Sequence, residues 1–224
     1  MDLDALKWND AGLVAVVVQD GATGEVRMVG WADVEAVRRT VATGEGWLWS
    51  RSRGELWRKG GTSGNTLAVR EVWADCDADA LVYVVDATGP TCHTGRASCF
   101  FRRVTATGVA EDAAASAAPV LVALGRELEA RKAATGAKSY TKSLLDAGAG
   151  RIGDKMREEA DEYARALAGE SDERVASEAA DVLYHLMVGL LARGLSLTDV
   201  ERELRRRAGT SGHAEKASRP GKVS

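Results

Sequence analysis

The chain consists of two parts that differ in composition, and this difference limits the folds it can adopt. All six tryptophans lie in the first third, in short segments that are rich in β-forming residues and interrupted by glycines. Beyond a small, polar stretch at 110–119, the chain is rich in Ala, Glu, Leu and Arg, with apolar residues at helical spacing. We therefore expect two domains: a β-rich α+β domain followed by an all-α domain.

The first half predicts strands and one short helix. The apolar run at 13–18 and the segment at 26–31 flank a Gly-rich turn at 21–24, and this pattern is typical of a hairpin. Asp33 is placed to cap a helix that runs through Val41. Further strands are expected at 47–53, 56–57, 69–74, 81–85 and 100–105.

The second half predicts helices joined by short links. Gly169 should end the third of them, Ser171 or Asp172 should cap the fourth, and Gly194 should end it. The expected helices cover 119–135, 138–147, 151–168, 172–193 and 197–207. The expected domains are 1–108 and 119–208, with a linker at 109–118 and a disordered tail at 209–224.

Composition and charge exclude several classes of protein. The net charge of -3 predicts no general attraction to nucleic acid or to an anionic membrane. No apolar run approaches the roughly 18 residues of a membrane span, and the start of the chain lacks the pattern of a signal peptide. Together with an odd number of cysteines, this predicts a cytoplasmic protein without a disulfide framework.

The only cysteines of the chain are Cys76, Cys92 and Cys99. Their separation differs from the paired, close spacing of a structural zinc finger. Three thiolates would leave a tetrahedral zinc ion with one open position, as in a catalytic zinc site. The alternative is that they are small buried hydrophobes. Polar neighbours such as His93 and Ser98 argue against that alternative.

Three aspartates, Asp75, Asp77 and Asp79, alternate around Cys76. They would share one face of a strand, or converge in a turn. Three like charges at such a spacing repel one another unless a cation neutralises them, and magnesium is the hard cation that carboxylates favour. The alternative is a solvated acidic loop.

Two segments upstream contain groups that bind phosphate. The first, at 49–53, carries Arg51 and Arg53; the second, at 59–64, starts with Lys59 and continues with Gly, Thr and Ser. Guanidinium groups, hydroxyls and exposed backbone N–H groups all donate hydrogen bonds to phosphate. Neither segment has P-loop spacing, so ATPase chemistry of that type is not indicated. The alternative is an ordinary hairpin with a basic face.

Taken together, the motifs at 49–53, 56–64, 75–79 and 92–100 resemble phosphoribosyl-AMP cyclohydrolase of histidine biosynthesis, over roughly residues 5–108. The resemblance implies a zinc-dependent hydrolase that opens the adenine ring between N1 and C6. It also implies a homodimer whose zinc site draws on both chains. Leu67 and Ala15 depart from the glutamine and proline usual in the family. The implied metal ligands are Cys76, Cys92 and Cys99 for zinc and Asp75, Asp77 and Asp79 for magnesium. His93 is adjacent to one of these ligands, so we expect it to transfer the proton. The residues expected to hold the phosphates of the substrate are Arg51, Arg53, Lys59, Thr62 and Ser63.

Acidic pairs recur at helical spacing in the second half. Glu159 and Glu162 are three residues apart, as are Glu178 and Asp181, so each pair lies on one helix face. If the two helices pack antiparallel, as the short link between them suggests, the carboxylates converge and would bind magnesium. The alternative is a charged face exposed to solvent.

The motifs at 128–131, 139–145, 155–160 and 178–185 resemble phosphoribosyl-ATP pyrophosphatase, a helical family related to the MazG-type pyrophosphohydrolases, over roughly residues 119–207. The resemblance implies cleavage between the α- and β-phosphates. Arg157 replaces a glycine common in the family. The implied residues are Glu158, Glu159, Glu162, Glu178 and Asp181 for magnesium, with Glu159 and Glu178 as catalytic groups, and Arg131, Tyr140, Lys142 and Lys155 for substrate.

The order of the two halves matches a fused bifunctional enzyme for the second and third steps of histidine biosynthesis. Its expected substrates are phosphoribosyl nucleotides, and its expected cofactors are Zn²⁺ and Mg²⁺. One alternative is a general nucleotide pyrophosphohydrolase whose first half binds nucleotide without catalysis. Another is a zinc-stabilised interaction module without enzymatic activity. The intact cysteines and His93 argue against the former, and the many phosphate donors argue against the latter.

Overall fold

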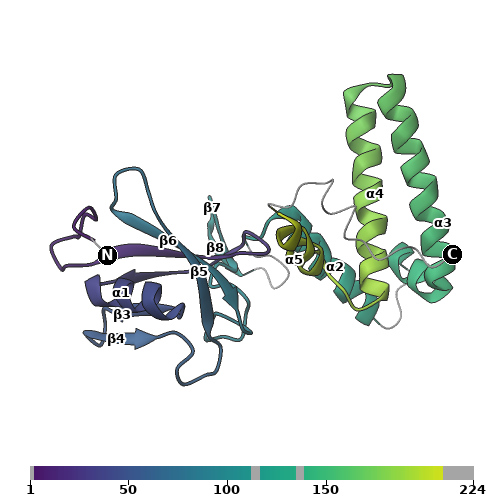
Figure 1. Cartoon of the computed structure of the whole chain (residues 1–224). Coiled ribbons are helices and arrows are strands. Elements are labelled where there is room, and N and C mark those ends of the chain that lie inside the picture. The colour runs from purple at the N-terminus through teal and green to yellow at the C-terminus, as the bar shows by residue number, and fades with distance from the viewer. Residues whose placement is uncertain (1–2, 112–116, 135–138, 209–224) are drawn as a thin grey trace. The chain divides into compact units, whose positions relative to one another are not determined.

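The computed structural model describes residues 3–111, 117–134 and 139–208. The chain separates into two compact units, Met1–Ala123 and Leu124–Ser224. Within the described residues, all strands belong to the first unit, and the second unit is helical (Figure 1). The expected order, a strand-rich domain followed by a helical domain, is therefore confirmed.

A mixed sheet with the strand order β2-β1-β6-β5 forms the centre of the first unit. Strands β1 (Val14–Asp20) and β2 (Val26–Ala32) form the predicted antiparallel hairpin. Strand β6 (Ala80–Ala87) lies parallel to β1 and antiparallel to β5 (Leu67–Ala74). The parallel pairing was not predicted, because it joins strands that are far apart in the sequence and leaves no local pattern.

One helix and a short hairpin accompany this sheet. Helix α1 (Val34–Thr43) begins as predicted, since the Asp33 carboxylate accepts a hydrogen bond from the backbone N–H of Ala36 at 2.7 Å. Strands β3 (Trp47–Ser50) and β4 (Glu55–Arg58) form the hairpin. Alternate residues of β1 and β6 point into the core, which includes Val14, Val16, Val18, Leu81, Tyr83 and Val85.

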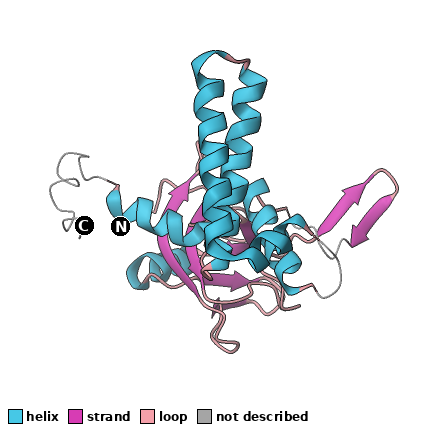
Figure 2. Ribbon diagram, turned by 90° about the vertical axis from the view of Figure 1, so that its right-hand side faces the viewer, coloured by secondary structure: helices cyan, strands magenta, loops and turns pink. Residues whose placement is uncertain are grey.

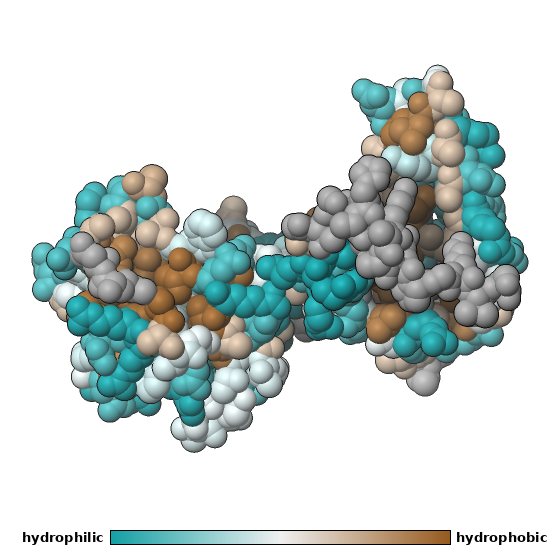
Figure 3. Space-filling model, in the orientation of Figure 1, coloured by the Kyte–Doolittle hydropathy of each residue, from teal (hydrophilic) through white to brown (hydrophobic). Residues whose placement is uncertain are grey.

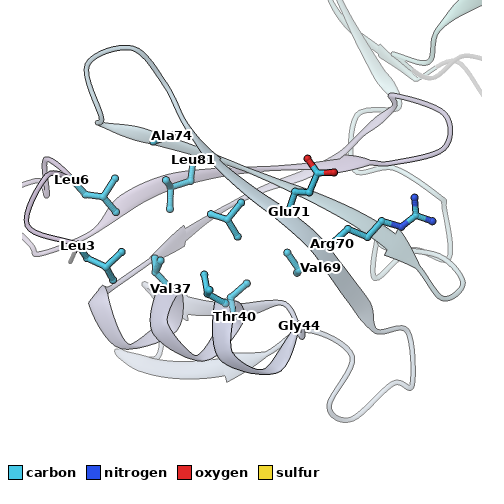
Figure 4. A pocket seen from close by; sticks show the side chains of 12 residues that line it. Leu3, Leu6, Val37, Thr40, Gly44, Val69, Arg70, Glu71, Ala74 and Leu81 are labelled. Atoms are coloured by element: carbon cyan, nitrogen blue, oxygen red, sulfur yellow. The ribbon is translucent and has the colours of Figure 1, made fainter. Parts of the chain in front are cut away.

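The first unit also exposes apolar surface, part of which is visible in Figure 3. A pocket of about 330 Å³ lies between α1 and β5, where Val37, Val69 and Leu81 line it together with Leu3 and Leu6 (Figure 4). None of the predicted site residues lines this pocket. The chemistry of the first unit therefore has to be sought in its loops.

A further hairpin, made of β7 (Arg102–Thr105) and β8 (Gly108–Glu111), follows the loop after β6. It stands clear of the sheet in Figure 2, and its Val104 and Val109 are exposed. The first residues of the predicted linker, 109–111, are thus part of a strand. Residues 112–116 of that linker and the predicted tail at 209–224 lie outside the described residues.

Helix α2 (Val120–Ala133) starts just before the boundary at Leu124, and the second unit further contains α3 (Tyr140–Gly169), α4 (Asp172–Ala192) and α5 (Leu197–Arg207). The two helices predicted for 138–168 form the single element α3, which is interrupted at Gly148, where φ is 83°. Ser171 caps α4 as predicted, because its hydroxyl accepts a hydrogen bond from the Arg174 N–H.

Helices α3 and α4 lie side by side (Figures 1 and 2). Their shared core contains Leu144, Ile152, Met187 and Val188. Helix α4 is long and apolar enough to meet the length and composition of a membrane span. Because it also carries buried acidic and histidine side chains, we interpret it as a helix of the bundle core.

Candidate metal and substrate sites

Two of the three cysteines form a thiol pair, Cys92 and Cys99, in the loop that follows β6. Their side chains are hydrogen-bonded to each other, and the Thr94 hydroxyl donates to Cys92 Sγ at 3.1 Å. Burial raises the pKa of Cys92, but hydrogen bonds from Thr94 and Cys99 and the charge of Arg96 together bring the net pKa below its ordinary value. Desolvation and the neighbouring Cys92 raise the pKa of Cys99 to about 11.

The thiol pair is therefore arranged so that the Cys99 thiol donates a hydrogen bond to the Cys92 sulfur. A soft metal ion replaces such a proton readily, because thiolate is the ligand that zinc and other soft ions select. The donor set fits zinc, with two sulfur ligands from this loop. His93 is exposed, and its Nδ1 lies 4.0 Å from Cys92 Sγ, which places an imidazole beside the pair.

The predicted phosphate loop at 59–64 lies next to the thiol pair. Lys59 is buried, its Nζ donates to the carbonyl of Asn65 at 3.5 Å, and its charge offsets a part of the rise in the pKa of Cys99. Gly60 adopts φ 83°, and a Cβ there would lie 2.4 Å from the Asn65 carbonyl oxygen. Only glycine allows this close turn. The side chains of Thr62 and Ser63 are exposed, so they are accessible to a ligand.

An acidic loop, Asp75, Asp77 and Asp79, connects β5 to β6. Carboxylate oxygens of the three residues all lie within 4.8 Å of one another. Backbone N–H groups of Ala80 and Asp79 donate to Asp75 and lower its pKa, whereas repulsion from Asp77 and Asp75 raises the pKa of Asp79. A hard cation would relieve this repulsion, so the donor set fits magnesium.

Cys76 lies in the acidic loop and not beside the other two cysteines. It precedes β6, whereas the thiol pair follows it; this strand of eight residues spans roughly 26 Å. Among the described residues, no group of three converging ligand atoms combines Cys76 with Cys92 and Cys99. Within one chain, the predicted zinc ligands therefore form two groups: Cys76 before β6, and the thiol pair after it.

The predicted arginines lie in the turn between β3 and β4 and are exposed. The Arg51 guanidinium stacks over the Trp31 ring at 4.9 Å. Trp31 pairs with Ala15, which in turn pairs with Ala80, so this ring belongs to the same end of the sheet as the acidic loop. Arg53 forms an ion pair with Glu55 at 2.9 Å. Neither arginine is buried, so both can turn toward a bound anion.

The second unit holds a carboxylate cluster, Glu159, Glu178 and Asp181, on the facing sides of α3 and α4. Oxygen atoms of the three side chains lie within 4.8 Å of one another, and both glutamates are buried. Lys155 Nζ lies 2.9 Å from Glu159, and Arg174 lies 2.5 Å from Glu178. Buried carboxylates that converge in this way suit a magnesium ion. The ion would neutralise the negative charge that Lys155 and Arg174 balance in its absence.

Two of the five predicted magnesium ligands lie outside the cluster. Glu158 is exposed and pairs with Lys155 at 2.9 Å, which lowers the pKa of this glutamate. Glu162 is partly exposed and lies 3.6 Å from Arg165. Residues 158 and 159 are successive in α3, so only one of them can point directly toward α4.

A hydrogen-bonded polar network adjoins the carboxylate cluster. Tyr140 Oη lies 3.1 Å from Nε2 of buried His185, and His185 Nδ1 lies 2.9 Å from the Asp181 carbonyl oxygen and 3.8 Å from Glu159. The predicted substrate residues Tyr140 and Lys155 thus both reach the surroundings of Glu159. His185 was not among the predicted site residues. The sequence pattern that could have identified His185 is its position four residues after Asp181, on the same helix face.

Arg131 joins the same region through Thr141. Its Nη1 donates to the Thr141 hydroxyl at 3.4 Å, and that hydroxyl lies 2.8 Å from Tyr184 Oη. Thr141 is fully buried, and neither it nor Tyr184 was predicted. Lys142 instead pairs with Asp146 at 3.9 Å on a more exposed face.

Both halves match known family models. Residues 28–101 match phosphoribosyl-AMP cyclohydrolase, and residues 121–208 match phosphoribosyl-ATP pyrophosphohydrolase. The fold and its two sets of sites thus define a two-domain hydrolase.

Curated relatives share this arrangement. The histidine biosynthesis bifunctional protein HisIE of Wolinella succinogenes is 40% identical over 223 residues, covering 97% of each chain. The protein of the same name from Bacillus subtilis is 41% identical over 204 residues, covering 91% of this chain and 95% of the relative. That from Aquifex aeolicus is 41% identical over 203 residues, covering 90% and 98%. The chain belongs to this family of bifunctional histidine biosynthesis proteins.

Proposed function

We propose that the chain catalyses two consecutive hydrolyses. The second unit converts phosphoribosyl-ATP to phosphoribosyl-AMP and pyrophosphate, and the first unit opens the purine ring of that product between N1 and C6. Membership of the bifunctional family supports both activities. The convergence of buried Glu159 and Glu178 with Asp181 carries the first reaction, and the thiol pair beside Lys59 carries the second.

For the pyrophosphohydrolase reaction, we assign magnesium to the carboxylate cluster. Glu158 and Glu162 lie outside this cluster and are proposed as further ligands. Magnesium supplies charge screening for the triphosphate and activates water. Glu159 and Glu178 act as the catalytic carboxylates, and Asp181 completes the cluster. Arg131, Tyr140, Lys142 and Lys155 hold the substrate. The carboxylates on the paired helices α3 and α4 support a MazG-like helical arrangement.

For the cyclohydrolase reaction, we assign zinc to Cys76, Cys92 and Cys99 and magnesium to the acidic loop. Zinc supplies a hydroxide nucleophile at neutral pH, because it lowers the pKa of water to about 7. In the ring opening, water would add its hydroxyl to C6 and its remaining proton would pass to N1 as the N1–C6 bond breaks. His93 is placed to carry that proton. Arg51, Arg53, Lys59, Thr62 and Ser63 bind the phosphates of the substrate.

The separation of Cys76 from the thiol pair supports a homodimer in which each zinc ion binds cysteines from both chains. A two-fold axis can place the acidic-loop end of one sheet against the thiol end of the other, and it does so twice. The phosphate loop of one chain then also meets the magnesium site of its partner. We also propose a cytoplasmic location, and domains that comprise residues 1–108 and 119–208.

The test is an assay of the purified full chain with phosphoribosyl-ATP and magnesium, with and without zinc. Glu178→Gln should stop pyrophosphate release, whereas Glu173→Gln, an exposed glutamate in the first turn of the same helix, should not. Cys99→Ala should leave pyrophosphate release intact and abolish the absorbance change of ring opening. Loss of both steps in either folded variant would contradict this division of labour.

A general nucleotide pyrophosphohydrolase is the second candidate function, since the carboxylate cluster alone would suit it. It predicts release of pyrophosphate from ordinary nucleoside triphosphates and no zinc requirement. Metal analysis separates the two proposals: the protein as isolated should contain zinc, and Cys92→Ser should lose it. Protein that binds no zinc would favour the second candidate.

A further inference from the structure

The segment that carries Cys99 is hydrogen-bonded to strand β2 by three contacts. The Cys99 N–H donates to the Arg27 carbonyl at 2.8 Å. The Ser98 hydroxyl donates to the Val26 carbonyl at 2.7 Å, and Arg27 Nη1 donates to the Ala97 carbonyl at 3.1 Å. Three successive residues of the loop are thus bonded to two successive residues of the sheet.

Ser98 holds the backbone on both sides of Cys99. While its hydroxyl donates to Val26, it also accepts the N–H of Phe100 at 3.0 Å. Ser98 is only 3% exposed, so water cannot replace these bonds without opening the loop. The buried hydroxyl therefore restricts the directions in which the Cys99 side chain can point.

Arg27 is itself held in place by Asp20. Its Nε and Nη2 donate to the same Asp20 oxygen at 3.2 and 2.7 Å, which leaves Nη1 directed at Ala97. The side chains of Arg27 and Asp20 are only 13% and 8% exposed. Asp20 in turn accepts hydrogen bonds from Thr23 in the turn between β1 and β2. The orientation of the guanidinium group is therefore set from the sheet.

We propose that Ser98 and Arg27 are positioning residues that place the Cys99 thiol against Cys92 before a metal binds. This rests on the proposed role of the thiol pair as zinc ligands. Groups that orient metal ligands typically change metal affinity by about 10- to 100-fold when they are removed. Ser98 and Arg27 do so here through backbone bonds, without touching either sulfur atom.

The experiment measures zinc affinity of the full chain by competition with a chromophoric chelator. Ser98→Ala removes the bonds to Val26 and Phe100, and Arg27→Lys keeps a positive charge for Asp20 but loses the planar group that reaches Ala97. Each should weaken zinc binding about 10-fold. Ser98→Thr retains the hydroxyl and should bind zinc more tightly than Ser98→Ala.

Thr40→Val is the matched control. Thr40 is 1% exposed, and its hydroxyl also bridges two backbone groups, donating to the Trp47 carbonyl at 3.3 Å and accepting the Trp47 N–H at 3.1 Å. It lies on α1 and these two hydrogen bonds lead to β3, so its variant should keep wild-type zinc affinity.

A second measurement does not involve the metal. Hydrogen exchange of the 96–100 backbone in zinc-free protein should accelerate in Ser98→Ala and remain unchanged in Thr40→Val. If the wild-type chain binds no zinc, the proposed zinc role fails. If it binds zinc, and Ser98→Ala and Arg27→Lys bind it as tightly as Thr40→Val does, positioning by these residues is wrong. Should Ser98→Ala not fold, Arg27→Lys decides between these outcomes.

Discussion

Tyr140 Oη lies 3.1 Å from Nε2 of His185, whose Nδ1 faces the Asp181 carbonyl at 2.9 Å. A carbonyl can only accept, so Nδ1 carries the proton and, in the neutral imidazole, Nε2 accepts from the Tyr140 hydroxyl. The phenol proton is thereby committed to His185. Tyr140 then presents lone pairs to a substrate, which suits a ribose hydroxyl better than a phosphate.

Tyr140→Phe and His185→Asn should therefore act through one shared hydrogen bond. We expect each variant to raise the KM for phosphoribosyl-ATP about 10-fold, equivalent to one lost hydrogen bond of about 1.4 kcal/mol. The double variant should be no worse than the more affected single variant. Steady-state measurement of pyrophosphate release tests this, and strictly multiplicative effects would show that the two residues act independently.

Gly60→Ala should damage ring opening and spare pyrophosphate release. The new Cβ would lie 2.4 Å from the Asn65 carbonyl oxygen, so the loop that begins with Lys59 has to shift. We expect the KM for phosphoribosyl-AMP to rise at least about 10-fold, because a misplaced phosphate contact costs binding and orientation.

Gly12→Ala is the control for backbone strain at this position. Gly12 also has a positive φ, 68°, but nothing lies within 4 Å of the position that a Cβ would occupy there. The KM of this variant should remain that of the wild type. Equal effects of the two substitutions would mean that strain, and not the position of the phosphate loop, is responsible.

The Asp20–Arg27 pair should make the stability of the first unit dependent on acid. Burial raises the pKa of Asp20, but the hydrogen bonds and charge of Arg27 together with hydrogen bonds from Thr23 outweigh it, so the folded pKa lies below the ordinary 3.8. A lowered carboxyl pKa stabilises the fold above the unfolded pKa, and this contribution is lost as the pH falls through the folded pKa. Asp20→Asn should thus lower the free energy of unfolding by about 2 kcal/mol at pH 7.

Denaturant titrations followed by tryptophan fluorescence measure this effect in the intact chain, because all six tryptophans belong to the first unit. The difference between wild type and Asp20→Asn should shrink as the pH falls below the ordinary carboxyl pKa of 3.8. A difference that stays constant with pH would mean that the charge of Asp20 contributes nothing.

Asp77→Asn should change the titration of its neighbour. Repulsion from Asp77 and Asp75 raises the pKa of Asp79, and removal of one charge should bring that pKa down toward its ordinary value in metal-free protein. Side-chain carboxyl NMR resonances report the titration directly. Bound magnesium should abolish the elevation of the Asp79 pKa in the wild type. An unchanged Asp79 pKa in Asp77→Asn would show that the three carboxylates do not interact in solution.

Local patterns predicted the elements well where the signal is itself local. The caps at Asp33 and Ser171 and the range of α5 needed only neighbouring residues. The break at Gly148 was predicted as the gap between two helices. The parallel pairing of β1 with β6 was missed, because a partner distant in sequence leaves no periodic signal.

The sites show the same limit. Helical spacing brought Glu159, Glu178 and Asp181 onto facing sides, but it could not decide whether Glu158 or Glu159 points inward, since that depends on the rotation of α3 against α4. The spacing of the cysteines likewise gave no indication that β6 would separate Cys76 from the thiol pair. Helical spacing placed His185 near the face that carries Glu178, but it gave this residue no role, because that role depends on Tyr140, which lies on another helix.

The placement of Cys76 and Cys92 beyond opposite ends of β6 has a genetic consequence if each zinc site is shared between two chains. A chain with Cys76→Ser and a chain with Cys92→Ser each form dimers with no intact zinc site. In a mixed dimer, one site collects both substitutions and the other collects neither. Two defective gene copies should therefore complement each other, and random mixing should restore about a quarter of the ring-opening activity.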